Sequence, residues 1–217
     1  MLYCKKRKET PHWEAKMKIY FAEIKGTDPQ RAKYPATGSH PASALGISLL
    51  AAAYEDYNGE GPTHLNALPR LKRLLGGKPV FAENPNLHFS ISHSRTHVIC
   101  ALSEYPVGVD TLDFRPLKEA TINALATPEE LEHFTIYELW ALRESVFKLT
   151  GTGNLRTMRF TRNDGKITPP QENVHCKLYF DLDNSATAVA FMQGDFPDHI
   201  LKIPTKNLLK SDGLLTR

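Results

Sequence analysis

The chain has few cysteines, little net charge and no long apolar run, and each shortage argues against a class of protein. Its three cysteines, Cys4, Cys100 and Cys176, are odd in number and far apart, which argues against a disulfide framework and a cysteine-rich zinc site. The 27 basic and 24 acidic residues leave a formal charge of only +3, without the dense basic clusters typical of nucleic-acid-binding proteins. We therefore expect a protein of a reducing compartment that binds no nucleic acid.

No segment is long and apolar enough to span a bilayer. The longest uncharged stretch covers 34–54, but only 42–54 is apolar and helix-like, short of the about 20 residues that a transmembrane helix needs. Residues 1–16 are basic and lack the apolar core of a secretory signal. We expect a soluble cytoplasmic protein in which 1–16 form an N-terminal extension.

Apolar periodicity predicts two long helices, one over 42–57 and one through 138–150. Short strands are predicted over 18–24, 87–92, 97–103, 107–113, 156–162, 174–180, 186–192 and 199–204. Both halves of the chain show a long helix followed by several short strands, without a clean linker between them. We therefore expect an α+β fold of two interlocked halves.

Local signals mark the ends of several elements. Thr127 and Glu130 form a capping box that predicts the start of a helix, and Gly151 predicts a helix end. The Asp-Gly pair within 162–167 predicts a tight hairpin turn.

The helix through 138–150 carries two stripes of side chains. One stripe is apolar and predicts a face packed in the core; it contains Leu139, Leu142, Val146 and Leu149. The second contains Trp140, Glu144 and Lys148. An exposed Glu–Lys pair in this order stabilises a helix by about 0.2–0.5 kcal/mol, so Glu144 and Lys148 indicate either a solvated ion pair or a functional site.

Other polar positions also admit a structural and a functional interpretation. Ser90 and Ser92 lie on one face of a predicted strand that ends at His93, where they would bind phosphate oxygens or cap the next turn. Lys78, in a Gly-Gly-Lys-Pro segment, is either a point charge for phosphate or an exposed loop lysine. Asp110 follows an apolar run and must be paired, solvated or bound to a cation; Glu144 is its candidate partner.

Two kinds of active site are not expected. The histidines at 88, 93 and 97 are spread over a predicted strand, a turn and the next strand. This arrangement does not bring their three rings to one point, so a zinc site is disfavoured. No G-x-S-x-G elbow is present, which disfavours a serine hydrolase.

Three ordered blocks resemble the motifs of the phosphopantetheinyl transferases, in particular the two-lobed surfactin-synthetase-activating (Sfp-like) type. They read GGKPVFAENPNLHFSISHS, VGVD and WALRESVFKLTGTG. These blocks match the family patterns G-K-P, F-N-I-S-H-S, G-(V/I)-D and W-x-x-K-E-x-x-x-K-x-x-G-x-G. The likeness covers roughly 17–200.

The resemblance implies two pseudo-symmetric lobes, each with a long helix packed on a small, mainly antiparallel sheet. The N-terminal lobe would cover 17–106 and the C-terminal lobe 107–217, with coenzyme A in the cleft between them. The implied enzyme is a monomer that transfers the 4'-phosphopantetheine arm of coenzyme A to a serine of an apo acyl or peptidyl carrier protein. Adenosine 3',5'-bisphosphate would leave.

The resemblance also implies roles for individual residues. Mg²⁺ would be held by Asp110 and Glu144, with Glu144 as the base for the serine proton and Lys148 stabilising the leaving phosphate. The catalytic residues are therefore expected to be Asp110, Glu144 and Lys148. The residues expected to bind coenzyme A are Ser43, Lys78, Ser92, His93 and Arg143.

The chain departs from the family pattern at four places. Leu112 stands where a second carboxylate is usual, and Asp113 follows one position late, on the other face of the strand. Arg143 replaces a lysine, Ser90 replaces an asparagine, and Ala42 replaces an arginine. These departures favour an alternative, a catalytically degenerate relative that binds coenzyme A or a carrier protein without transfer.

Overall fold

The computed structural model describes residues 17–34, 42–59, 68–74 and 77–210, and it shows the expected α+β fold. The helices are α1 (Ser43–Asn58), α2 (Glu119–Leu125), α3 (Pro128–Leu131) and α4 (Ile136–Thr150), with 3-10 turns η1 (Pro29–Arg31) and η2 (Thr205–Leu208). The strands are β1 (Met17–Glu23), β2 (Leu71–Arg73), β3 (Pro79–Phe81), β4 (His88–His93), β5 (His97–Ser103), β6 (Val107–Asp113), β7 (Thr161–Asn163), β8 (Lys166–Thr168), β9 (His175–Tyr179), β10 (Ser185–Phe191) and β11 (Leu201–Lys202).

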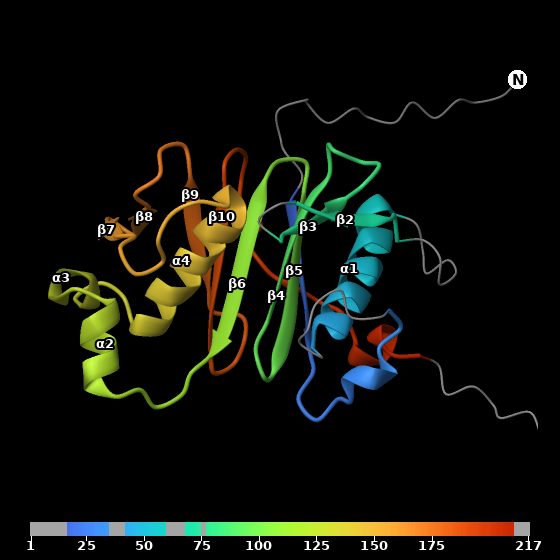
Figure 1. The fold of residues 1–217 in the computed structure, drawn as a ribbon, viewed down its shortest axis with the longest axis horizontal. Helices are drawn as coiled ribbons and strands as arrows, with labels where there is room; N and C mark the ends of the chain where they lie inside the picture. The colour runs from blue at the N-terminus through green and yellow to red at the C-terminus, as the bar shows by residue number, and fades with distance from the viewer. Residues whose placement is uncertain (1–16, 35–41, 60–67, 75–76, 211–217) are drawn as a thin grey trace, which may run out of the picture.

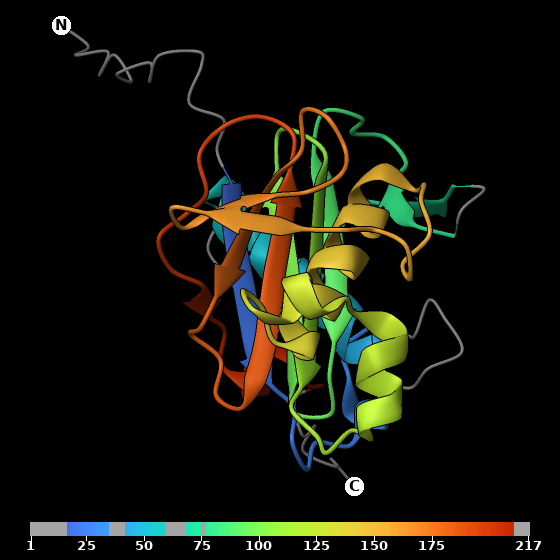
Figure 2. The same cartoon turned by 90° about the vertical axis from the view of Figure 1, so that its left-hand side faces the viewer.

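The strands form two main sheets and a small ribbon. The first sheet has the order β11-β1-β5-β4, the second has the order β6-β10-β9-β8-β7, and β2 pairs with β3. Within the runs β1-β5-β4 and β6-β10-β9 all neighbours are antiparallel. The long helices α1 and α4 lie on either side of the strands (Figure 1), and Figure 2 views the fold from the side on which α4 and α2 lie.

Both faces of the central strands are buried, which explains their nearly continuous apolar sequences. One face of the first sheet packs on α1, and one face of the second packs on α4. Their other faces share a third apolar cluster, which includes Ile19, Ile99, Val109 and Val189. Every residue of β5 and of β10 is therefore buried.

The two sheets meet along the edge strands β4 and β6. Here hydrogen bonds to serine hydroxyls replace the backbone hydrogen bonds that join neighbouring strands within a sheet. The amide of Val109 donates to Ser90 Oγ at 3.0 Å, and the amide of Thr111 donates to Ser92 Oγ at 3.4 Å. This seam, defined by β4 and β6, satisfies edge amides that would otherwise be buried without a partner.

Several local predictions are confirmed. The capping box at Thr127 and Glu130 begins α3, and Gly151 ends α4 with a left-handed φ of 69°. Asp164 and Gly165 both have positive φ, as a two-residue hairpin turn between β7 and β8 requires.

Other predictions need correction. The capping box at Thr127 starts a helix of only four residues, because α4 has its own box at Thr135 and Glu138. The strand predicted over 156–162 is confined to β7, and the β2–β3 ribbon and α2 were not predicted. Helix α1 begins at Ser43, one residue later than predicted, and no side chain caps it.

The chain returns to the first sheet near its C-terminus. Strand β11 pairs parallel with β1, and Lys33 donates its amide to the Leu208 carbonyl at 2.8 Å. The predicted boundary between the two lobes at residue 107 therefore does not separate the sheets completely, because β11 belongs to the first sheet. Cys4 and the extension 1–16 lie outside the described residues, and among the described helices none is long and apolar enough to cross a membrane.

Candidate functional site

Asp110 is the buried centre of the candidate site. It lies in the middle of β6, not at the strand end, and its residue is 7% exposed. Its Oδ1 accepts hydrogen bonds from Ser92 Oγ and from Lys148 Nζ, both at 2.6 Å. One carboxylate oxygen of Asp110 is therefore held by a donor on β4 and by a donor on α4. No described residue donates to the other oxygen, Oδ2.

Helix α4 brings Glu144 and Lys148 to this carboxylate. Lys148 Nζ also donates to the Val109 carbonyl at 3.2 Å, so the ammonium is held along β6. Glu144 lies one turn earlier on the same helix. Burial raises the pKa of Glu144, and the nearby Asp110 charge raises it further, while Lys148 opposes both effects. The structure therefore brings Asp110, Glu144 and Lys148 together.

Two carboxylates at this point suit a magnesium ion. Mg²⁺ usually takes one or two carboxylates and completes its shell with substrate phosphates and waters. Asp110 offers Oδ2, and the half-buried Glu144 lies near enough for the charge of Asp110 to raise the Glu144 pKa. No group of three or more acidic, histidine or cysteine ligands occurs among the described residues. The donor set fits a cation only together with phosphate oxygens of a substrate.

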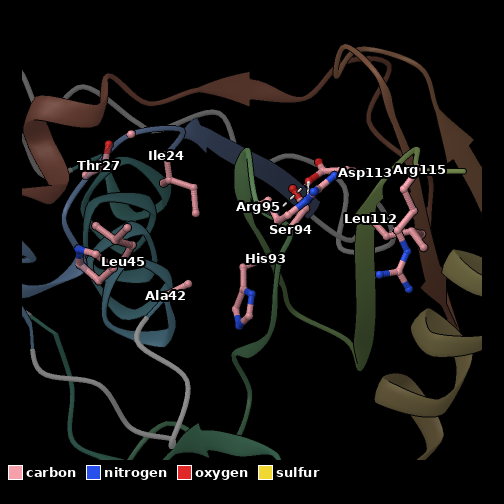
Figure 3. A pocket seen from close by; sticks show the side chains of 12 residues that line it. Ile24, Thr27, Ala42, Leu45, His93, Ser94, Arg95, Leu112, Asp113 and Arg115 are labelled. Carbon is pink, nitrogen blue, oxygen red and sulfur yellow. Dashed lines mark hydrogen bonds and ion pairs between the residues drawn. The ribbon is translucent and has the colours of Figure 1, made fainter.

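A cleft of about 610 Å³ lies between the two sheets at the end of the seam. His93 stands at its centre, with Ala42, the residue before α1, on one side and Leu112 and Arg115 on the other (Figure 3). The positively charged Arg115 was not singled out from the sequence, and no motif marks it. The cleft has the size and charge for a nucleotide-bearing ligand.

Asp113 does not supply the missing carboxylate. It accepts a hydrogen bond from the amide of Arg95 at 2.9 Å and another from the hydroxyl of Thr96. Its side chain therefore secures the turn between β4 and β5. This agrees with its predicted position on the opposite face from Asp110.

The two hydroxyl groups expected near coenzyme A differ in their surroundings. Ser43 Oγ is buried without a hydrogen-bond partner among the described residues, beside Ala42, which lines the cleft. Ser92 Oγ is committed to Asp110 Oδ1. Ser92 therefore orients the carboxylate, and its place beside coenzyme A stays a prediction.

Arg143 does not face the cleft, so its expected contact with coenzyme A is wrong for this structure. Its side chain is fully buried and its Nη2 contacts both Glu130 carboxylate oxygens at 3.0 Å. Its Nη1 donates to the Leu125 carbonyl. A helix turns about 100° per residue, so Arg143 and Glu144 point in different directions. Arg143 anchors α2 and α3, whereas Glu144 reaches the seam.

Lys78 is neither an exposed loop lysine nor a free charge for phosphate. Its Nζ donates to the Val107 carbonyl at 3.0 Å and to the Lys148 carbonyl at 2.8 Å. Burial lowers the pKa of Lys78 to about 8, and the Lys148 charge adds to this shift. The ammonium is thus bonded to β6 and α4, and the direct phosphate contact stays a prediction.

Gly108 is a further site residue whose role depends on contact between distant segments. A Cβ at this position would lie 2.7 Å from the Leu149 amide nitrogen and nearer still to the Ser145 carbonyl oxygen. A glycine inside a predicted strand is the available sequence signal, because it indicates close approach of another backbone. Gly108 lets α4 lie directly against β6.

Comparison with curated proteins gives consistent relatives, although no profile of a protein family matches the chain. The 4'-phosphopantetheinyl transferase Sfp of Bacillus subtilis (strain 168) is 29% identical over 151 residues, which cover 61% of this chain and 67% of that protein. The 4'-phosphopantetheinyl transferase ffp of Bacillus subtilis is 30% identical over the same coverage. A further 4'-phosphopantetheinyl transferase of Bacillus subtilis is 33% identical over 144 residues, or 57% of this chain and 63% of the relative.

The relatives and the sequence motifs agree. The chain belongs to the Sfp-type 4'-phosphopantetheinyl transferase family.

Proposed function

We propose that the protein transfers the 4'-phosphopantetheine arm of coenzyme A to a serine of an apo acyl or peptidyl carrier protein. The observation that carries this proposal is the meeting of Asp110, Glu144 and Lys148 where β6 contacts α4. Two carboxylates, of which Glu144 is also the base, and a lysine cation are the groups that transfer of a phosphate-linked arm requires. Adenosine 3',5'-bisphosphate is the second product.

The reaction is a displacement at phosphorus. The carrier serine oxygen attacks the β-phosphorus of the coenzyme A pyrophosphate, and the bond to the bridging oxygen breaks. Glu144 accepts the serine proton, directly or through water, since its raised pKa makes it a better base than an ordinary carboxylate. Lys148 offsets the negative charge that develops on the leaving phosphate.

Asp110 and Glu144 would hold Mg²⁺. The ion, when bound, neutralises charge on the pyrophosphate oxygens. Ser92 contributes by fixing Asp110 through its 2.6 Å hydrogen bond to Oδ1, the oxygen that Lys148 also contacts, so that Oδ2 has no donor among the described residues. A leucine at position 112 means that water or phosphate completes the metal shell.

The cleft is the proposed site of coenzyme A. His93 and Arg115 supply donors for its phosphates, and Ser43 offers a buried hydroxyl near the start of α1. We infer that β1-β5-β4 with α1 and β6-β10-β9 with α4 are two pseudo-symmetric lobes, because their strand orders and pairings correspond. A paired site within one chain suits a monomer, and free Cys100 and Cys176 suit the cytoplasm.

Mass spectrometry of an apo carrier protein tests this function. The carrier should gain one phosphopantetheine arm when it is mixed with the protein, coenzyme A and Mg²⁺, and chelation should stop the gain. Glu144→Gln should abolish transfer without loss of the fold. The exposed Glu132→Gln is the matched control and should keep full activity. Full activity of Glu144→Gln would contradict the mechanism.

One observation favours a second candidate, a relative that binds without transfer. Only two carboxylates meet at the site among the described residues, because Leu112 occupies the third position. This candidate predicts coenzyme A binding that does not depend on metal, and no mass gain on any carrier protein. The same experiment therefore separates the two functions.

A further inference from the structure

Lys78 joins a loop of the first half of the chain to the catalytic helix. It immediately precedes β3 in the β2–β3 ribbon, yet its Nζ contacts residues 29 and 70 positions later in the sequence. Both partners are backbone carbonyls, of Val107 at the start of β6 and of Lys148 in the last turn of α4. The Lys148 carbonyl is one of the four at the helix end that lack an intrahelical donor. A cation is favoured there by the helix dipole.

Lys148 makes the reciprocal contact from helix to strand. Its own Nζ donates to the Val109 carbonyl at 3.2 Å and to Asp110 Oδ1 at 2.6 Å. Lys78 and Lys148 therefore donate hydrogen bonds to the β6 carbonyls on either side of Gly108. The missing side chain at Gly108 lets the backbone of α4 lie against this point, between the two lysines.

We propose that Lys78 is a positioning residue that fixes the last turn of α4 and thereby sets Lys148 against Asp110. The proposal rests on the phosphopantetheinyl transfer proposed above. Lys78 acts through the main chain of Lys148, whose side chain is the group that meets the reacting phosphate. Two of the three N–H donors of the ammonium already have carbonyl partners before coenzyme A arrives.

The proposal predicts different effects on kcat and on the affinity for coenzyme A. A residue that places a catalytic group affects kcat, whereas a phosphate ligand affects the affinity for coenzyme A. Loss of the Lys78 amine should let the end of α4 shift on β6. A misplacement of about 1 Å in a catalytic group can lower the rate about 10²-fold.

The test compares Lys78→Met with wild type and with Lys72→Met, an exposed lysine on β2 of the same ribbon. Steady-state transfer gives kcat, and calorimetry gives the Kd for coenzyme A. We expect kcat to fall about 10²-fold in Lys78→Met with Kd unchanged. Lys72→Met should match wild type in both. Lys78→Gln, which keeps an N–H donor, should recover part of the lost kcat.

Each other result overturns the proposal in a recognisable way. A weaker Kd at unchanged kcat would make Lys78 a phosphate ligand. Lower thermal stability with unchanged kcat and Kd, or loss of fold in both Lys78 variants alone, would make its role purely structural. Absence of transfer by wild type would overturn the proposed function itself, and this inference with it.

Discussion

Replacing Gly108 with alanine is expected to separate β6 from α4. The added Cβ would meet the Leu149 amide nitrogen at 2.7 Å and the Ser145 carbonyl oxygen at a shorter distance. Both obstacles are backbone atoms of a regular helix, so no side-chain rotation can make room. The helix must retreat by about 1 Å to restore normal packing distances.

This retreat should reduce both stability and activity. Overpacking costs about 1–3 kcal/mol where side chains can adjust, and a backbone obstacle places Gly108→Ala at about 3 kcal/mol or more. The same movement carries Glu144 and Lys148 away from Asp110, and a displacement near 1 Å can cost about 10²-fold in rate. Urea unfolding gives the first quantity, and the mass assay of carrier modification gives the second.

Gly46→Ala is the matched control on the other long helix. Its Cβ would lie 2.9 Å from Ile91 Cγ2, a side-chain methyl on β4 and not a backbone atom, so a small shift of one side chain relieves the contact. Alanine also gains about 1 kcal/mol over glycine inside a helix, so this variant should remain within about 1 kcal/mol of wild type. The reasoning is refuted if Gly108→Ala unfolds at the wild-type urea concentration and transfers at the wild-type rate.

Three further predictions follow from the charged groups. Arg143→Met should cost about 3 kcal/mol in urea unfolding, because it removes the buried cation that contacts Glu130 at 3.0 Å and leaves only the more distant and more exposed Arg159, at 3.9 Å; the double variant with Glu130→Gln should lose less. Glu144 has a raised pKa in the folded protein, so its contribution to stability is present at low pH and is lost as pH rises through that folded value. Glu144→Gln should therefore melt higher than wild type at neutral pH, and an unchanged melting temperature there would contradict the assignment. Leu112→Glu should raise the affinity for Mn²⁺, measured by titration, since position 112 shares a strand face with Asp110.

The sequence predicts the secondary structure well where apolar residues are periodic. The apolar stripe of α4 is buried as expected, and β5 and β10 are strands. The ribbon formed by β2 and β3 has no such pattern, because its strands have three residues each and only Phe81 among the six is buried. The periodic pattern of apolar residues arises where one face of an element is buried, so short elements with few buried residues do not show it.

The directions of charged side chains could not be predicted in the same way. Helical geometry separates Arg143 from Glu144, but it does not say which of them meets the cleft. That depends on Glu130, 13 residues earlier, whose capping position places a carboxylate over Arg143. Lys78 is similar, since its carbonyl partners come from elements far along the chain. Motif matching identified the residue types, and tertiary contacts decided their partners.

The seam also explains why a serine in place of the family asparagine is compatible with this site. Strand β6 is an edge strand, so the Val109 amide has no neighbour on that side within its own sheet. Ser90 Oγ accepts this amide, and a hydroxyl oxygen is an acceptor just as an amide oxygen is. The backbone on either side of Asp110 is thus fixed by Ser90 and Ser92, and its carboxylate by Ser92 and Lys148. A buried carboxylate is tolerated at a sheet edge because its main chain and its charge are both satisfied from neighbouring elements.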